Sequence, residues 1–398
     1  MKPAAVAARP AQVTVPVWAL AALMTVIGLN LRASLGSVPP LLDDITRDLE
    51  LSGLEQGLLT SLVVAFMGIG APVGHRVAVR VGAVNGMGVG LAVLSLGCLL
   101  RLVPAGAPLL LCSCAIVGAG MGAASALVPS LIASHLSRIR GLAVGLYTTG
   151  TAVGVALAAW IATPVEESLG GWRPALAFWG VIAAVTALVW VATARRLPAD
   201  PPPEGRVERR LPWRSPTAWW ITWFTASAML IGFSGLAWVT PLFLHLGTSE
   251  HHAAGLFAVF QLVGPVSMVA VSWLTDVVVD RRPLLAVVIT ASTTGVLFLL
   301  VAPLTLAVPS MVLFGIGAGG CSTLALVLLV DVTRTQADAT RLGAMVILIA
   351  YLVGATGPAL LGILREATGG FTAGYAVLLA IGILSLLSVP MFGPQRRL

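Results

Sequence analysis

Two glycine-rich stretches decide the architecture of this chain: VGAGMGAA at residues 117–124 and FGIGAGGC at residues 314–321. Each is followed by a stretch that contains a tyrosine and glycines, GLYTTGTAVG at 145–154 and AYLVGATGP at 350–358. A third pair comes next, GGWRPALAFW at 170–179 and GGFTAGYAVL at 369–378. The three pairs occur in the same order at an offset of roughly 200 residues. This pattern predicts that the chain consists of two related halves.

The sequence around these pairs is too apolar for an ordinary water-soluble protein. Hydrophobic residues make up 58% of the chain and charged residues 10%, whereas charged residues make up roughly 25% of soluble domains. A membrane-spanning helix needs about 20 apolar residues. Candidate segments lie at roughly 15–41, 54–73, 84–103, 108–134, 141–163, 173–194, 218–244, 254–274, 284–303, 307–330, 342–364 and 373–392. We therefore expect an all-α membrane protein with twelve transmembrane helices in two pseudo-symmetric six-helix halves.

One long polar stretch separates the two halves. Residues 195–217 read RRLPADPPPEGRVERRLPWRSPT, and their proline content and charge are typical of a linker. The predicted organisation is a first half at 1–194, a linker at 195–217 and a second half at 218–398. Two halves related by an axis along the membrane normal are typical of transporters that bind solute at their interface near the bilayer midplane.

The distribution of arginine and lysine predicts the orientation, because these residues accumulate in cytoplasmic loops. Eighteen of them lie on one predicted side of the membrane and four on the other. The first side holds both termini and the linker, so we expect these in the cytoplasm and the chain in a bacterial-type cytoplasmic membrane. The net charge of +7 is then a topology signal. It does not indicate nucleic-acid binding, because the basic residues form no basic domain.

Other classes of protein lack support in the sequence. The four cysteines lie inside apolar segments, where cysteine mostly packs as a small residue, and no metal-ligand spacing occurs. No acids, histidines or nucleophiles cluster as an enzyme would require. We expect no enzyme activity, no metal and no cofactor, and we expect a monomer whose partners are the lipid bilayer and a small solute. A receptor without transport is the remaining alternative, although no output domain is apparent.

Four stretches resemble a known transporter family: LNLRASLGSVPPLL at 29–42, APVGHRVAVRVG at 71–82, GLAVGLYTTG at 141–150 and LGGWRPALAFW at 169–179. With these residues the chain resembles the major facilitator superfamily, specifically its cyanate permease and 2-nitroimidazole exporter family. The resemblance covers essentially the whole chain. It implies solute transport by alternating access, but it fixes neither the solute nor the direction.

The resemblance also implies a network of gating ion pairs at the cytoplasmic side. The superfamily's loop between helices two and three usually has an acidic residue after its glycine, and here His75 stands near that place. The second-half copy, SWLTDVVVDRRP at 272–283, keeps its acidic and basic residues, so the second half is favoured. The candidate gating residues are Arg76, Arg80, Asp276, Asp280 and Arg281.

Arg32 is the most informative single residue. It lies about 17 residues into the first apolar segment, so about 13 Å of helix separates it from the outer end. An arginine at such depth costs about 3 kcal/mol or more, and no acidic residue lies in the interior of any apolar segment to neutralise it. We expect Arg32 to face a water-filled cavity and to bind a solute. The alternative is a structural role, in which Arg32 bonds backbone carbonyls near Pro39 and Pro40.

Five further residues are candidates for solute contact: Asn30, Tyr147, Trp238, Gln261 and Tyr351. Tyr147 and Tyr351 occupy matching places in the two halves, and Trp238 offers a flat apolar wall. Gln261 is a lone amide in an apolar segment, and such groups usually face the bundle interior. Each also has a structural alternative in helix packing, interfacial anchoring or interhelical hydrogen bonding.

The planar guanidinium of Arg32 suits small flat oxyanions or a cyanate-like solute. The leading hypothesis is a secondary transporter of a small anionic or polar planar solute, and the close alternative is an exporter of neutral nitroheterocycles. Because no Asp, Glu or Lys is buried in the predicted membrane interior, we expect anion exchange or facilitated passage without a membrane carboxylate.

Overall fold

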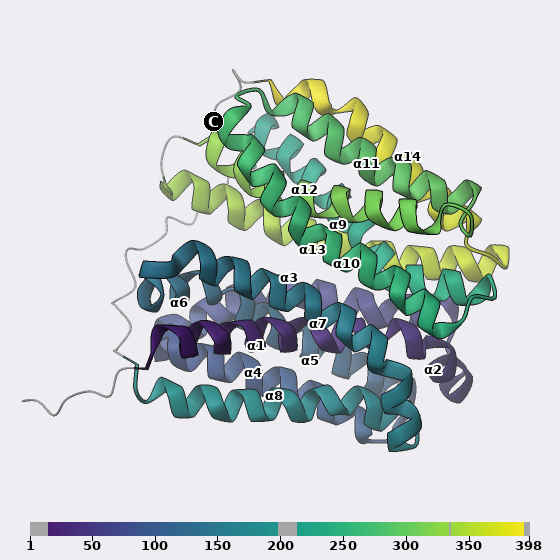
Figure 1. The fold of residues 1–398 in the computed structure, drawn as a ribbon, viewed down its shortest axis with the longest axis horizontal. Helices are drawn as coiled ribbons and strands as arrows, with labels where there is room; N and C mark the ends of the chain where they lie inside the picture. The colour runs from purple at the N-terminus through teal and green to yellow at the C-terminus, as the bar shows by residue number, and fades with distance from the viewer. Residues whose placement is uncertain (1–14, 198–212, 334–335, 394–398) are drawn as a thin grey trace, which may run out of the picture.

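The computed structural model describes residues 15–197, 213–333 and 336–393. The described chain forms two helical bundles, which run from α1 to α8 and from α9 to α14 (Figure 1). The first bundle contains α1 (Val17–Gly36), η1 (Pro39–Leu41), α2 (Leu42–Leu49), α3 (Gly53–Val81), α4 (Ala83–Leu99), η2 (Leu100–Leu102), α5 (Gly106–Ser125), α6 (Val128–His135), η3 (Ser137–Ile139), α7 (Arg140–Leu169) and α8 (Trp172–Ala194). The second contains α9 (Pro216–His245), α10 (Glu250–Val277), α11 (Arg281–Val301), α12 (Ala307–Asp331), α13 (Gln336–Thr368), α14 (Thr372–Leu387) and η4 (Val389–Phe392). Most of the predicted linker, 198–212, lies outside the described residues.

Within the described residues, eleven helical stretches are long and apolar enough to cross a membrane. The last apolar helix, α14, has 16 residues and continues into the short turn η4. The predicted all-α membrane fold is therefore confirmed, with eleven helical units of membrane length and the shorter apolar helix α14 as a twelfth within the described residues. Proline divides two of these units. Pro39 and Pro40 separate α1 from α2, and Pro129 stands at the start of α6, because proline lacks the N–H that would continue the preceding helix.

The glycine-rich repeat produces the same close helix contact in each half. In the first half, a methyl group on Gly118 or Gly122 of α5 would overlap the backbone of α3. In the second half, Gly315 and Gly319 of α12 lie equally close to the backbone of α10. Small residues allow membrane helices to approach this closely, so the repeated sequence encodes a repeated helix pair.

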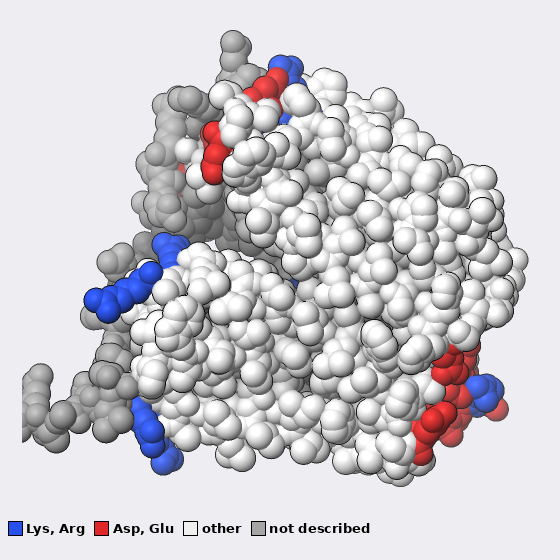
Figure 2. Space-filling model, viewed as in Figure 1, with Lys and Arg blue, Asp and Glu red and all other residues white. Residues whose placement is uncertain are grey.

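Charges mark the two ends of the bundles. We call the end where α1 begins the basic end; it carries Arg76, Arg80, Arg138 and Arg140, all exposed or half-buried. We call the opposite end, around α2, the acidic end; it carries Asp43, Asp44 and Asp48. Figure 2 shows blue residues at the left, basic end and a red patch at the lower right, acidic end.

The two bundles make contact along α3 with α13 and along α7 with α10. In the described part of the chain, all three hydrogen bonds that cross between the bundles join α3 to α13, from Gly53 to Ser61 of α3. These residues belong to the acidic-end portion of α3. Toward the basic end the bundles separate (Figure 1), and the space-filling view shows a recess between them there (Figure 2). The protein is therefore closed at its acidic end and open at its basic end.

Candidate substrate site between the two halves

Arg32 lies near the end of the membrane-embedded helix α1 and is half-buried. Within the described residues, its guanidinium makes no hydrogen bond and no ion pair. Its nitrogen atoms are also absent from the set of fully enclosed, unpaired polar atoms in the described chain, so they retain access to solvent. This environment fits a cation that faces a wet cavity rather than one that caps the backbone at Pro39.

Two tyrosines, one from each half, pack against glycines of the first half. Tyr147 of α7 packs on Gly28 of α1, where an added methyl group would lie 3.0 Å from the tyrosine ring. Tyr351 of α13 packs in the same way on Gly68 of α3, where an added methyl group would lie 2.7 Å from its Cβ. Tyr147 lies near both Arg32 and Tyr351. The structure therefore brings Tyr147 together with Arg32 of its own half and with Tyr351 of the other half.

An aromatic wall stands on the second-half side of this cluster. The ring of Phe233 on α9 lies 6.1 Å from that of Tyr351, centroid to centroid. Both rings pack with Val64 of α3 and Ala355 of α13 in a small apolar cluster that spans the two halves. One side of the site is therefore cationic and the other is aromatic and apolar.

Asn30 and Trp238 lie elsewhere in this conformation. Asn30 is fully buried, and its amide nitrogen donates to the hydroxyl of Thr186 on α8 at 3.2 Å. The Trp238 side chain is 1% exposed, and its indole N–H donates to the carbonyl of Pro358 at 2.9 Å. Both side chains bind protein partners within their own half. Gln261 is half-buried on α10 and has no hydrogen bond within the described residues.

Polar side chains join α3 and α13 at the acidic end, and the sequence alone did not reveal this closure. The N–H of Gly53, at the first turn of α3, donates to Glu366 at 2.6 Å. Arg365 donates to the side-chain oxygen of Gln56 at 2.9 Å. A carboxylate at a helix N-terminus is favoured by the helix dipole, and the arginine pair is charge-assisted. No spacing rule identifies these pairs, because the partners of the first hydrogen bond are 313 residues apart.

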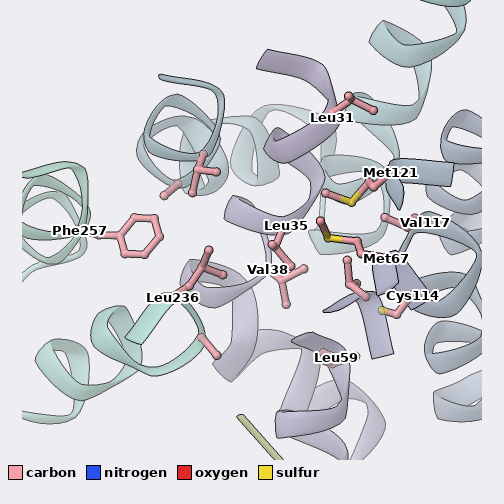
Figure 3. Packing of buried hydrophobic residues seen from close by; sticks show 14 of the residues in the cluster. Leu31, Leu35, Val38, Leu59, Met67, Cys114, Val117, Met121, Leu236 and Phe257 are labelled. Carbon is pink, nitrogen blue, oxygen red and sulfur yellow. The ribbon is translucent and has the colours of Figure 1, made fainter. Parts of the chain in front are cut away.

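Apolar residues complete the closure beneath these polar pairs. Leu236 and Phe257 of the second half belong to the same buried cluster as Leu35 and Val38 of the first, and Leu236 is the nearer of the two to Val38 in Figure 3. When Gly28 of α1 is aligned with Gly232 of α9, Arg32 is matched by Leu236. The internal repeat therefore places a cation in one half and an apolar closing residue in the other.

Loss of the Arg365 hydrogen bond should loosen the acidic end. Arg365 also lies over the rings of Trp238 and Phe371, at 5.5 and 4.9 Å from their centroids. A hydrogen bond to a charged group contributes about 1.5–3 kcal/mol, and partial exposure reduces that contribution. We expect Arg365→Met to raise the population open at the acidic end about tenfold, measured as a longer distance between spin labels placed across this end. An unchanged distance distribution would count against the closure assigned to Arg365.

Two of the three candidate gating residues of the second half, Asp280 and Arg281, form ion pairs at the basic end. Arg281 pairs with Asp331, at the end of α12, at 2.7 Å, and Asp280 pairs with Arg282 at 2.7 Å. Asp280 also caps the N-terminus of α11. Hydrogen bonds from the side chain and backbone of Arg282 hold the pKa of Asp280 below its usual value. Asp331 had not been predicted, since it ends an apolar segment without a distinguishing motif.

The remaining gating candidates are exposed in this conformation. Arg76, Arg80 and Asp276 make no hydrogen bond or ion pair with any part of the chain that the structure describes. The observed basic-end ion pairs therefore lie within the second half, as expected for a protein whose halves are apart at that end.

These features define a class: a two-half membrane transporter with a central site that is open at one end. The chain belongs to the Major Facilitator Superfamily, whose sequence pattern matches residues 19–358. It is therefore a secondary transporter embedded in a membrane, and it acts on a small-molecule solute and is not an enzyme.

Curated relatives share this length and fold. The chain is 28% identical over 356 residues to the "Uncharacterized transporter YycB" of Bacillus subtilis (strain 168), covering 89% of this chain and 88% of the relative. It is 27% identical to the "2-nitroimidazole transporter" of Escherichia coli (strain K12), covering 94% of each chain. It is also 27% identical to the "Cyanate transport protein CynX" of the same organism, covering 94% of this chain and 98% of the relative. The predicted resemblance is confirmed at this level of distance.

Solved structures confirm the fold. A D-xylose-proton symporter superposes with a TM-score of 0.78 at 17% identity, covering 96% of this chain and 98% of that one. The inward open conformation of the Escherichia coli xylose transporter XylE gives the same TM-score at 14% identity, covering 95% and 96%. At these identities the likeness concerns the fold alone.

Proposed function

We propose that this protein carries a small anionic or strongly polar planar solute, of the size of cyanate, across the membrane by alternating access. The observation that carries the proposal is the guanidinium of Arg32, which is half-buried near Tyr147 and has no hydrogen-bond or ion-pair partner in the described residues. An anion in the cavity would supply the missing charge. A relative that is named as a cyanate transport protein supports this class of solute.

Such a solute would lie between the cationic side of the site and its aromatic, apolar side. Arg32 would bind the negative oxygen or nitrogen atoms, while the Tyr147 and Tyr351 hydroxyls donate hydrogen bonds from the two halves. The ring of Phe233 would lie against the flat face of the solute. Because Tyr147 and Tyr351 belong to different halves, a solute that binds both would connect the halves and favour their closure.

We place the basic end in the cytoplasm, because arginine and lysine accumulate in cytoplasmic loops. The conformation, open at the basic end, is then inward-facing. The pairs Arg281–Asp331 and Asp280–Arg282 would belong to the inner gate, and Arg76 and Arg80 would join it when the halves close there. We further propose that the protein works as a monomer in a bacterial-type cytoplasmic membrane.

A second candidate function is export of neutral nitroheterocycles. The aromatic pair Phe233 and Tyr351 supports it, because a flat heterocycle can stack on such a wall. A relative that is named as a 2-nitroimidazole transporter supports the same reading. In this case Arg32 would bind the polarised nitro group, and the contribution of its charge would be smaller.

A ligand screen on purified protein tests the two candidates together. A ligand that binds the folded state raises the unfolding temperature, and a stabilisation of about 1 kcal/mol corresponds to about 2–4 °C in a domain of about 150–250 residues. We expect cyanate, nitrate or thiocyanate to do so in the wild type and in the exposed-site control Arg138→Gln, but not in Arg32→Gln. An equal shift by 2-nitroimidazole in all three proteins, with no response to the anions, would favour the heterocycle exporter.

Transport should depend weakly on the proton gradient. In the described membrane helices, the acidic residues lie at or near helix ends rather than in the bilayer interior, so no deep carboxylate is available to carry a proton. We expect the initial rate of solute uptake into proteoliposomes to change by less than about twofold when a protonophore collapses an imposed pH gradient at constant membrane potential. Loss of most of the uptake would require a proton carrier other than a buried carboxylate.

A further inference from the structure

A second arginine is buried in the first half, away from the candidate substrate site. Arg101 lies in η2, between α4 and α5, and is 2% exposed. It is one of the four basic residues that the sequence places on the outer side of the membrane. The structure instead directs its side chain inward, among Cys98 of α4 and Ser113 and Cys114 of α5.

The protein satisfies the Arg101 guanidinium only in part. Its Nε donates to the Ser113 hydroxyl at 3.3 Å, and one terminal nitrogen donates to the Cys114 thiol at 3.8 Å. The other terminal nitrogen, Nη1, is fully enclosed and has no hydrogen-bond partner. None of the acidic residues in the described chain forms an ion pair with Arg101. A buried charge with neutral and weak acceptors alone is strongly disfavoured, so a missing anionic partner is the simplest compensation.

The surroundings restrict what this partner can be. The buried hydroxyl of Ser34 on α1 lies against the Cys98 thiol in the same cluster. Because Arg101 is almost fully enclosed, a lipid headgroup or a bulky anion cannot reach it. The exposed neighbours Leu102 and Val103 place the cluster next to the acidic-end surface.

This cluster is separate from the cation at the transport site. Arg32 and Ser34 lie two residues apart on α1, so they point about 200° apart around its axis. Arg32 interacts with Tyr147 on α7, whereas Ser34 lies against Cys98 of α4 on the other side. Arg32 and the cluster around Arg101 therefore lie on opposite sides of α1.

We propose that Arg101 is the centre of a structural binding site for a small monovalent anion such as chloride, bound by Nη1 within the first half. The ion neutralises the guanidinium and stabilises the packing of α4 and α5 behind α1. The site is independent of the proposed transport function, since it requires neither Arg32 nor the second half.

Chloride dependence of thermal stability tests this site. We would titrate chloride from zero to 100 mM against gluconate at constant ionic strength, and measure the unfolding temperature of the full-length protein in detergent. At 100 mM chloride we expect a rise of about 2–5 °C for the wild type and for Arg32→Gln, growing with the logarithm of the chloride concentration, and no rise for Arg101→Gln. Sulfate should not replace chloride because of its size and charge.

Crystals soaked in bromide give a second measurement that does not depend on the stability of the Arg101 variant. We expect an anomalous peak within hydrogen-bonding distance of Arg101 Nη1. No chloride-dependent shift in the wild type, an undiminished shift in Arg101→Gln, or no bromide peak at Nη1 would each overturn the site. Loss of the shift in Arg32→Gln instead would mean that chloride binds in the transport cavity.

Discussion

Arg32→Gln should reduce transport of an anionic solute about 100-fold. A guanidinium and an anion about 4 Å apart gain about 4 kcal/mol at an effective dielectric constant near 20, before desolvation. Arg32 is half-buried, so desolvation of the ion and the side chain offsets part of this gain. A remainder of about 2.7 kcal/mol corresponds to a factor of about 100. The initial rate of uptake into proteoliposomes, at several imposed membrane potentials, measures the loss.

Two variants serve as controls for Arg32→Gln. Arg32→Lys keeps the charge but loses the planar two-pronged geometry, so we expect an intermediate rate. Arg138→Gln removes an exposed arginine at the basic end and should transport at close to the wild-type rate. If the glutamine variant moves the anion as fast as the wild type at every potential, the anion site at Arg32 is refuted. A neutral solute that is moved equally well by both proteins would support the heterocycle exporter.

Gly57→Val should hold the protein open at its acidic end. A Cβ on Gly57 of α3 would lie 2.6 Å from the Cα of Ala359 and 2.8 Å from the carbonyl carbon of Pro358, both backbone atoms of α13. Such overlap with rigid backbone costs about 3 kcal/mol or more, but only while the two halves are closed here. The valine would therefore shift the equilibrium away from the closed acidic end by about 100-fold and slow the transport cycle at least tenfold.

Spin labels at Glu50→Cys and Ala367→Cys would report the change, in a background where the exposed Cys112 is replaced by serine. We expect the distance between the labels to lengthen in Gly57→Val, while the unfolding temperature changes little. Gly122→Val is the matched contrast, because it overlaps the backbone of Met67 within the first half. This overlap is present whichever end of the protein is open, so Gly122→Val should lower the unfolding temperature.

Gly145→Ala is the control for helix propensity, since no atom outside its local helix backbone lies within 4 Å of the added methyl group. It should leave both the label distance and the unfolding temperature near their wild-type values. If Gly57→Val shows a wild-type distance distribution and normal flux, the contact between α3 and α13 is not part of the transport cycle.

The sequence identified a candidate site residue where the residue type at one position was unusual by itself. Arg32 stood out because a charge deep in an apolar segment is costly wherever the helix packs. Tyr147 and Tyr351 stood out because they repeat at matching places in the two halves. Asn30 and Trp238 looked similar in sequence, yet they are buried against Thr186 and the Pro358 carbonyl. Their roles depend on how each helix is rotated, and helices that are apolar on all sides give no periodic signal of that rotation.

The sequence by itself determined the membrane class, the twelve apolar segments, the two related halves and the presence of Arg32 within the first apolar segment. These properties follow from hydropathy and repeated spacing along the chain, so they need no knowledge of which helices touch. Only the tertiary structure decided that Gln56 meets Arg365, that Gly53 meets Glu366 and that Arg101 is buried. Those contacts join separate helices, some of them more than 300 residues apart, and their energies exist only once the helices have packed.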